Sequence, residues 1–149
     1  MKYAVRAEGA LQVISHPAIY ALISDDSSPD VHEFALPEDA QSLVFWDDFA
    51  VGAVVCRPLS GICLDVHIQV LPQYRDDALE MACHARDLLF EAGWEKLTAQ
   101  IPFCHENVKV FAEKVGFVEE GVNERSIVKG GVHYDQWYMG LSKWDLQPE

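Results

Sequence analysis

The stretch VLPQYRDDALEMA, residues 70–82, decides the fold. The residues that lead into it, LDVHIQV at 64–70, alternate apolar and polar side chains, which predicts a half-buried strand. The residues from Asp76 to Trp94 carry apolar side chains at helical spacing, and Gly93 ends that segment. The chain therefore passes from a strand into a helix within residues 70–82.

Further strands and helices are predicted on both sides of this stretch. The expected strands are 2–6, two runs within 42–58 that turn at Asp47-Asp48, 96–102, and two runs within 117–146 that turn at Gly130-Gly131. The expected helices begin at Ser15-His16-Pro17 and cover 105–117. This order predicts an α/β (α+β) fold with a mixed, mostly antiparallel sheet flanked by helices, formed by residues 1–149 as a single domain.

The composition excludes several classes of function. The chain has 24 acidic and 11 basic side chains, a formal net charge of −13, which argues against nucleic acid and against anionic membranes as partners. No apolar run approaches the roughly 20 residues that a membrane-spanning helix needs. The first residues, MKYAVRAEGA, lack the apolar stretch of a signal peptide, so we expect a cytoplasmic protein.

The four cysteines show no spacing that is typical of a zinc site. Two of them precede a histidine, at Cys83-His84 and Cys104-His105. Neighbouring side chains point apart on a helix or a strand, so such pairs seldom bind one ion. We therefore expect small buried thiols and no metal site.

Three segments, in order, resemble signatures of the GNAT superfamily of acyl-CoA N-acyltransferases. Residues 70–82 resemble the segment V-x-P-x-Y-R-G-x-G-x-G-x-A, in which a strand enters a helix. Residues 111–121, FAEKVGFVEEG, resemble the next signature, an aromatic-rich helix that ends in E-K-x-G-F. Residues 133–145, HYDQWYMGLSKWD, resemble the closing strand. The resemblance implies the GNAT fold and acetyl-CoA-dependent transfer of an acetyl group to an amine or peptide acceptor.

The resemblance also implies which residues hold acetyl-CoA. In the family, the turn between strand and helix wraps the pyrophosphate with backbone N–H groups and the helix dipole. Aligned on Lys114, Gly116 and Phe117, the asparagine at the start of the family's second helix corresponds to His105, and Asn107 lies nearby. The cofactor contacts expected from this alignment are Val70, Tyr74, Arg75, Asp76, Asp77, Ala78, Glu80, His105 and Asn107.

The turn departs from the family at its glycines. Asp76, Ala78 and Glu80 occupy the three glycine positions, and Asp77 adds a further carboxylate. These side chains are expected in the first turn of the helix, where acidic groups stabilise the helix end and occupy the place of a phosphate. Two anions about 4 Å apart repel by about 4 kcal/mol at an effective dielectric constant of roughly 20.

The polar face of the strand at 64–70 supplies the candidate general base. His67 has an unperturbed pKa of about 6.5, which suits taking a proton from an ammonium group near neutral pH. Asp65 lies two positions earlier on the same face and could orient it. The tyrosine that serves as general acid in the family corresponds to Ala112, so Tyr138, or Tyr134, is the candidate acid from the final strand. A polar strand face covered by loops is the structural alternative.

The sequence leaves two functions open. One is an acetyl-CoA-dependent N-acetyltransferase, whose acidic surface would attract a cationic amine or basic peptide. The other is a GNAT-fold binding or assembly module without activity, because the turn lacks its glycines, the second helix lacks its tyrosine, and carboxylates stand where phosphates would lie. Residues 67–82 also look similar to GNAT-like proteins of tailed phages, and a phage-encoded module would be virion-associated. The aromatic side chains are read as core packing or as a contact surface for a protein partner or a second copy: Trp46, Trp94, Trp137, Tyr138 and Trp144.

Overall fold

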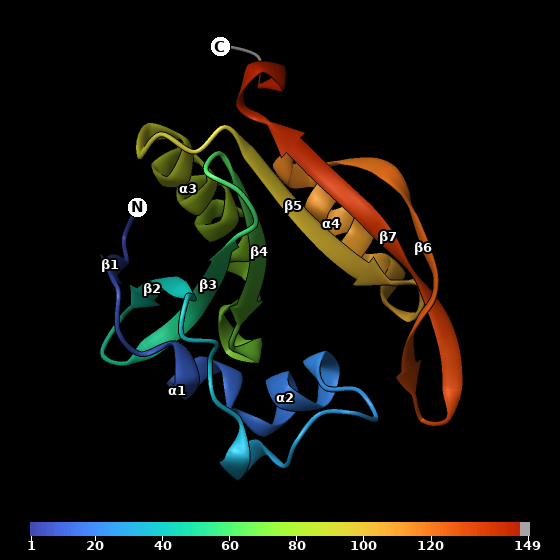
Figure 1. Cartoon of the computed structure of the whole chain (residues 1–149). Helices are drawn as coiled ribbons and strands as arrows, with labels where there is room; N and C mark the ends of the chain where they lie inside the picture. Colours follow the sequence, from blue (N-terminus) through green and yellow to red (C-terminus); the bar gives the residue numbers. More distant parts are fainter. Residues whose placement is uncertain (147–149) are drawn as a thin grey trace.

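A computed structural model of the chain describes residues 1–146. Its sheet has seven strands in the order β1-β2-β3-β4-β5-β7-β6 (Figure 1). Neighbouring strands are antiparallel except for β4 and β5, which are parallel. The strands are β1 (Ala4–Arg6), β2 (Gln41–Trp46), β3 (Ala50–Pro58), β4 (Cys63–Val70), β5 (Lys96–Pro102), β6 (Val118–Lys129) and β7 (Val132–Ser142). The predicted fold class, a mostly antiparallel sheet flanked by helices, is confirmed.

Four α-helices accompany the sheet within residues 1–146. They are α1 (Ala10–Ile14), α2 (Pro17–Ile23), α3 (Ala78–Glu91) and α4 (Glu106–Val115). The helix predicted to begin at Pro17 does so, and the His16 side chain accepts a hydrogen bond from the Ala18 N–H at 3.1 Å. The five-residue helix α1 follows Gly9, which has φ 104°, and was not predicted.

The start of α3 differs from the prediction. Residues Pro72–Asp77 form a 3₁₀ helix, η2, so that α3 begins only at Ala78. The reason is local, because Pro72 suits a first helical position and the Ala78 N–H bonds back to the Arg75 carbonyl. Asp76 and Asp77 therefore lie in η2, and of the acidic residues only Glu80 lies in the first turn of α3.

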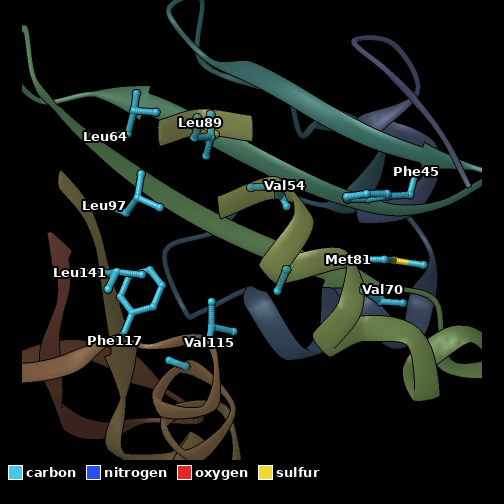
Figure 2. Packing of buried hydrophobic residues seen from close by; sticks show 14 of the residues in the cluster. Phe45, Val54, Leu64, Val70, Met81, Leu89, Leu97, Val115, Phe117 and Leu141 are labelled. Carbon is cyan, nitrogen blue, oxygen red and sulfur yellow. The ribbon is translucent and has the colours of Figure 1, made fainter. Parts of the chain in front are cut away.

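Hydrophobic side chains pack on both faces of the sheet. One cluster joins the sheet to α3 and α4, and Figure 2 shows part of it, with Phe45 and Met81 at one end and Leu141 and Phe117 at the other. The second cluster joins the opposite face to α1 and α2 through Val13 and other buried residues. The sheet is therefore covered by helices on each side, as expected for this class.

The parallel strands β4 and β5 pair over a short length. Their register contains only three residue pairs, Cys63 with Lys96, Leu64 with Leu97, and Asp65 with Thr98. Beyond these pairs the two strands diverge, which Figure 1 shows as the widening space between β4 and β5. The carboxyl ends of both strands, and the N-terminal ends of α3 and α4 that follow them, lie at the open end of this divergence.

Candidate functional site

A cavity of about 340 Å³ lies where β4 and β5 separate. Its lining combines apolar side chains of both strands and of the inner sides of α3 and α4 with a small set of polar groups from the end of α2, from α3, from β4, β5, β6 and β7, and from the start of α4. The polar and titratable residues among them are Ser24, His67, Gln69, Arg86, Gln100, His105, Asn107, Lys129 and Gln136. A mostly apolar cavity with a few convergent polar groups is the usual form of a small-molecule site.

The edge of β4 that faces this cavity is open. Within the described residues, β4 pairs with β3 along one edge as far as Val70, but with β5 only as far as Asp65. The backbone N–H and C=O groups from Val66 to Val70 on the β5 side therefore have no strand partner. Such an edge can hydrogen-bond an extended, amide-containing ligand in the way that a further strand would.

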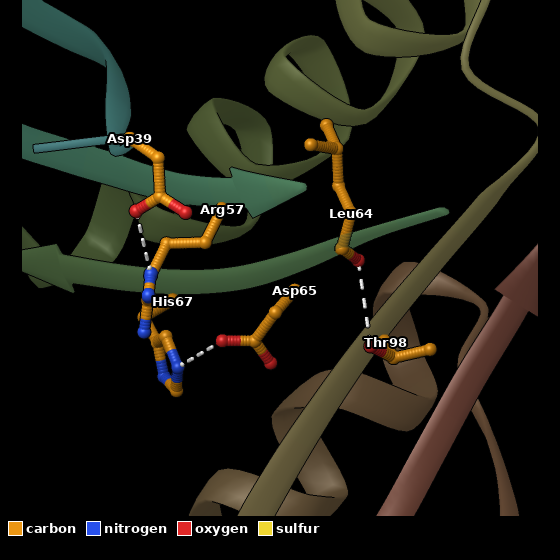
Figure 3. A network of polar contacts seen from close by, with 6 residues as sticks. All are labelled: Asp39, Arg57, Leu64, Asp65, His67 and Thr98. Atoms are coloured by element: carbon orange, nitrogen blue, oxygen red, sulfur yellow. Dashed lines mark hydrogen bonds and ion pairs between the residues drawn. The ribbon is translucent and has the colours of Figure 1, made fainter. Parts of the chain in front are cut away.

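His67 and Asp65 are brought together as the alternation of β4 predicts. The His67 Nε2 atom lies 2.9 Å from Asp65 Oδ2, and the two side chains are drawn in Figure 3. His67 lines the cavity and is half-exposed, whereas Asp65 is more covered. The pair can hold the imidazole in one orientation, with its other nitrogen available, which is the arrangement that a general base requires.

At the start of α3, Asp77 is held away from the helix amides. Its carboxylate accepts a hydrogen bond from the Tyr3 hydroxyl and lies 3.1 Å from the Lys2 Nζ atom. It makes no side-chain hydrogen bond to α3, although it occupies the N-cap position. The hydrogen bonds from Tyr3 and Lys2 lower the pKa of Asp77, and the bond to Asp77 raises the pKa of Tyr3 to about 12.

The backbone of η2 uses some of the amides that the resemblance assigns to a pyrophosphate. The Tyr74 N–H donates to the Leu71 carbonyl at 2.9 Å, and the Ala78 N–H donates to the Arg75 carbonyl. A 3₁₀ turn thus replaces the open glycine turn of the family. The predicted contact residues from Tyr74 to Glu80 lie outside the lining of the cavity, and Val70 is a buried core residue that packs beside Gly52.

His105 and Asn107 both line the cavity at the junction of β5 and α4. The Nε2 atom of His105 is buried without a hydrogen-bond partner among the described residues. Burial lowers the pKa of His105, and the nearby charge of Lys129 lowers it further, while the Leu22 backbone opposes this change. The lowered pKa favours the neutral imidazole, which can accept a hydrogen bond.

The structure does not bring Tyr138 to the cavity. Tyr138 lies on β7, opposite Gln100 of β5, and 42% of its surface is exposed. Gln100 lines the cavity but Tyr138 does not. Ala112, the residue at the family's tyrosine position, does line it, so this position offers no hydroxyl group.

Lys129 is a cavity residue that the sequence did not indicate. It lies at the end of β6, and its Nζ atom donates to the Leu22 carbonyl at 2.7 Å and to the Ala21 carbonyl at 3.3 Å. The contact joins residues that are more than 100 positions apart. No local pattern around Lys129 signals it, because its place depends on how α2 and the β6–β7 hairpin meet.

Replacing Tyr3 with phenylalanine is expected to lower the free energy of unfolding by about 1–3 kcal/mol near neutral pH, since a hydrogen bond to a carboxylate is lost. Because the pKa of Tyr3 rises from 10.0 to about 12 on folding, this contribution is complete below pH 10 and disappears as the pH rises towards 12. Urea unfolding of both proteins, at neutral pH and again above pH 10, measures the difference.

The control for this experiment is Tyr20→Phe, which removes a hydroxyl that donates to the backbone carbonyl of Pro29. It measures the loss of an uncharged hydrogen bond. An equal difference between the natural protein and Tyr3→Phe at both pH values would contradict the assigned pairing with Asp77.

Within residues 1–146, no helix is long and apolar enough to cross a membrane, and no group of three or more His, Cys, Asp or Glu side chains is arranged to hold a metal ion. The cysteines are less buried than expected: all four are free thiols, of which Cys56 is buried, Cys63 and Cys83 are partly buried and Cys104 is exposed.

Comparison with known proteins gives matches only at the level of structure. No family model matches the chain, and no curated protein matches it in sequence. The spermidine N-acetyltransferase of Vibrio cholerae in complex with CoA and spermine superposes with a TM-score of 0.79 at 16% identity, covering 97% of each chain. A putative phosphinothricin N-acetyltransferase superposes with a TM-score of 0.74 at 16% identity, covering 95% of this chain and 98% of that one.

Proposed function

The chain has the fold of the GNAT N-acetyltransferases, and from this premise we propose that it transfers an acetyl group from acetyl-CoA to a small amine. The observation that carries the proposal is the separation of β4 from β5 after three residue pairs, with a cavity of about 340 Å³ between them. We take residues 1–149 as one catalytic domain. The solved structure with CoA and spermine supports both an acetyl-CoA donor and an amine acceptor.

The site fits one half of acetyl-CoA well. The open edge of β4, from Val66 to Val70, offers backbone donors and acceptors to the two amides of an extended pantetheine arm. Apolar side chains on both sides of the cavity suit the rest of that arm. His105 and Asn107 lie at the start of α4 and are the polar side chains proposed to contact the cofactor there.

The diphosphate half meets a less favourable surface. Arg75 and the first amides of α3 are the groups proposed to hold it, and Asp76 and Glu80 are the charges that oppose it. Asp77 does not compete for the helix amides, because Tyr3 and Lys2 hold its carboxylate. This placement of Asp77 supports the enzyme, because carboxylates bonded back onto those amides would have favoured the alternative, an inactive assembly module.

The proposed chemistry of the protein resides on β4. When bound, acetyl-CoA supplies the activated acetyl group. His67 accepts the proton that the acceptor's ammonium group must lose before its nitrogen can attack, and Asp65 orients the imidazole through the contact at 2.9 Å. The position of Tyr138, outside the cavity lining, gives no support to the proposal that it acts as a general acid.

Replacing His67 with alanine is expected to slow acetyl transfer by about 100- to 10,000-fold, because general base catalysis is lost. Acetyl-CoA binding, measured by calorimetry, should stay within about threefold, since the pantetheine contacts proposed on β4 come from its backbone. The assay is release of free CoA thiol with a panel of primary amines. The acetyl-transfer rate of Asp65→Asn should lie between the rates of the natural protein and of His67→Ala, because this substitution affects only the orientation of the imidazole.

The matched control is His133→Ala, an exposed histidine of β7 outside the cavity lining, which should retain full activity. Acetyl-CoA binding without thiol release for any amine would contradict the proposed activity. Equal rates for the natural protein and His67→Ala would leave the activity in place but remove His67 from it.

A further inference from the structure

We propose that the acceptor carries a carboxylate or a similar anionic group beside its amine, as an amino acid does, and that Lys129 binds this anionic group. The inference rests on the proposed function, because it names the acceptor class of the same cavity. It reverses the expectation from the overall charge, which favoured a cationic acceptor.

The lining of the cavity has the opposite charge from the chain as a whole. The sequence contains 24 acidic side chains, and none of the described ones lines the cavity. Two of the eleven lysine and arginine residues do, Arg86 and Lys129, together with His67 and His105. A second ammonium group of a polyamine would therefore find no carboxylate to pair with inside the cavity, whereas an anion would find a cation.

Arg86 is already occupied by protein groups. Its Nε atom lies 2.9 Å from Asp87 Oδ1, and its Nη1 atom donates to the Val115 carbonyl at 2.7 Å. These contacts pair it with one carboxylate and fix it between α3 and α4. Of the two cations in the lining, Lys129 is the one with no carboxylate partner among the described residues.

Lys129 is held in place with one donor left over. An ammonium group has three N–H donors, and two of them bond the Leu22 and Ala21 carbonyls near the end of α2. Among the described residues, no carboxylate oxygen lies within 4.0 Å of its Nζ atom. The nearby Asp26 carboxylate accepts hydrogen bonds from the N–H groups of Gly130 and Gly131, each at 2.8 Å, and does not line the cavity.

The neighbours of Lys129 suit a ligand with two polar ends. The lowered pKa of His105 disfavours a second cation beside Lys129. The uncharged amides of Gln100 and Gln136 also face the cavity, and His67 lies on β4, the strand on the other side of the divergence. An amino acid whose carboxylate bonds Lys129 can direct its amine towards the strand that carries the proposed base.

The test compares ligands that differ only at the carboxylate. Calorimetry without cofactor measures binding of methionine, leucine and glutamate, each beside its own α-amide, and of spermidine. The natural protein is expected to bind the tightest of the acids about 10- to 100-fold more strongly than its amide, because one charge-assisted hydrogen bond is lost. Lys129→Met should remove this preference, and Lys129→Arg should keep most of it.

Two further variants separate the effect of the Lys129 charge from other effects of a substitution. Lys143→Met removes a surface lysine outside the cavity lining and should leave the preference unchanged. Gln100→Met removes an uncharged amide from the lining but keeps the Lys129 charge, so it should change binding of acid and amide about equally. Loss of the preference in Gln100→Met to the same extent as in Lys129→Met would overturn the assignment.

The result also separates this inference from the proposed function. Tighter binding of the amides or of spermidine, or no binding of any acid, overturns the inference whatever the activity. Tight binding of an acid without acetyl transfer to it supports the inference and counts against the proposed function. Acetyl transfer to acid and amide at equal efficiency supports the function and overturns the inference.

Discussion

The double substitution Asp76→Asn and Glu80→Gln is expected to tighten acetyl-CoA binding by about 100-fold. Each carboxylate lies near the start of α3, and at roughly 10 Å from a phosphate it costs about 1–2 kcal/mol at an effective dielectric constant near 20. The amide side chains keep the size of the originals, so the substitution changes charge alone. Calorimetry at several salt concentrations measures acetyl-CoA binding by both proteins, and the gain in affinity should shrink as ionic strength rises.

The matched control removes two carboxylates at the other end of the same helix, by Glu91→Gln and Glu95→Gln. Glu91 is the last residue of α3 and Glu95 follows the helix, so both lie more than two helical turns beyond Glu80 and their effect on a ligand at the helix start is screened. Less than about a threefold change is expected from the control. Equal tightening by both pairs would show a general effect of net charge, and no tightening by either would remove the diphosphate from this position.

Replacing Phe45 with alanine is expected to cost about 3–5 kcal/mol of the free energy of unfolding, the usual range for a large aromatic side chain lost from a core. Phe45, which Figure 2 shows beside Met81 of α3, has 0% exposure. Its ring lies 6.4 Å from that of His84, also on α3. Few neighbours can move to refill the space, because β2 is held on both sides by β1 and β3. Denaturant unfolding monitored by circular dichroism measures the loss.

Phe49→Ala is the control for this change. Phe49 follows the turn between β2 and β3, is 45% exposed, and contacts Tyr74 edge to face at 6.0 Å. Its loss should cost less than about 1.5 kcal/mol, since mainly the aromatic contact is removed. Similar costs for the two variants would mean that the core around Phe45 relaxes far more than its packing indicates.

The sequence predicted most of the fold because its signals are local. Alternation in 64–70 and helical spacing after residue 76 depend on neighbouring side chains, and the turns at Asp47 and Gly130 carry residues that such turns require. The five-residue helix α1 was missed, since one and a half turns give too few positions for a periodic pattern. Asp76 and Asp77, the last two residues of the 3₁₀ helix, were predicted as the start of the α-helix because the two kinds of helix carry similar residues there.

Only the part of the site that lies on a single strand could be predicted from the sequence. His67 and Asp65 share a face of β4, so their contact follows from the strand period of two. Lys129, by contrast, reaches the cavity through the meeting of α2 with a hairpin from the far end of the chain. Its place in the cavity depends on the contact between residues 22 and 129, and neither the composition nor the periodicity of the sequence reveals that contact.

The short pairing between β4 and β5, only three residue pairs long, also affects how the protein opens. Strands β1 to β4 pair in chain order with antiparallel neighbours, and β5, β6 and β7 form a second group. Within the sheet, the two groups are joined by the three residue pairs between β4 and β5, whereas β3 and β4, β5 and β7, and β6 and β7 each pair over seven or more residues. Local opening at this short junction therefore opens the cavity while each group keeps its own strands paired.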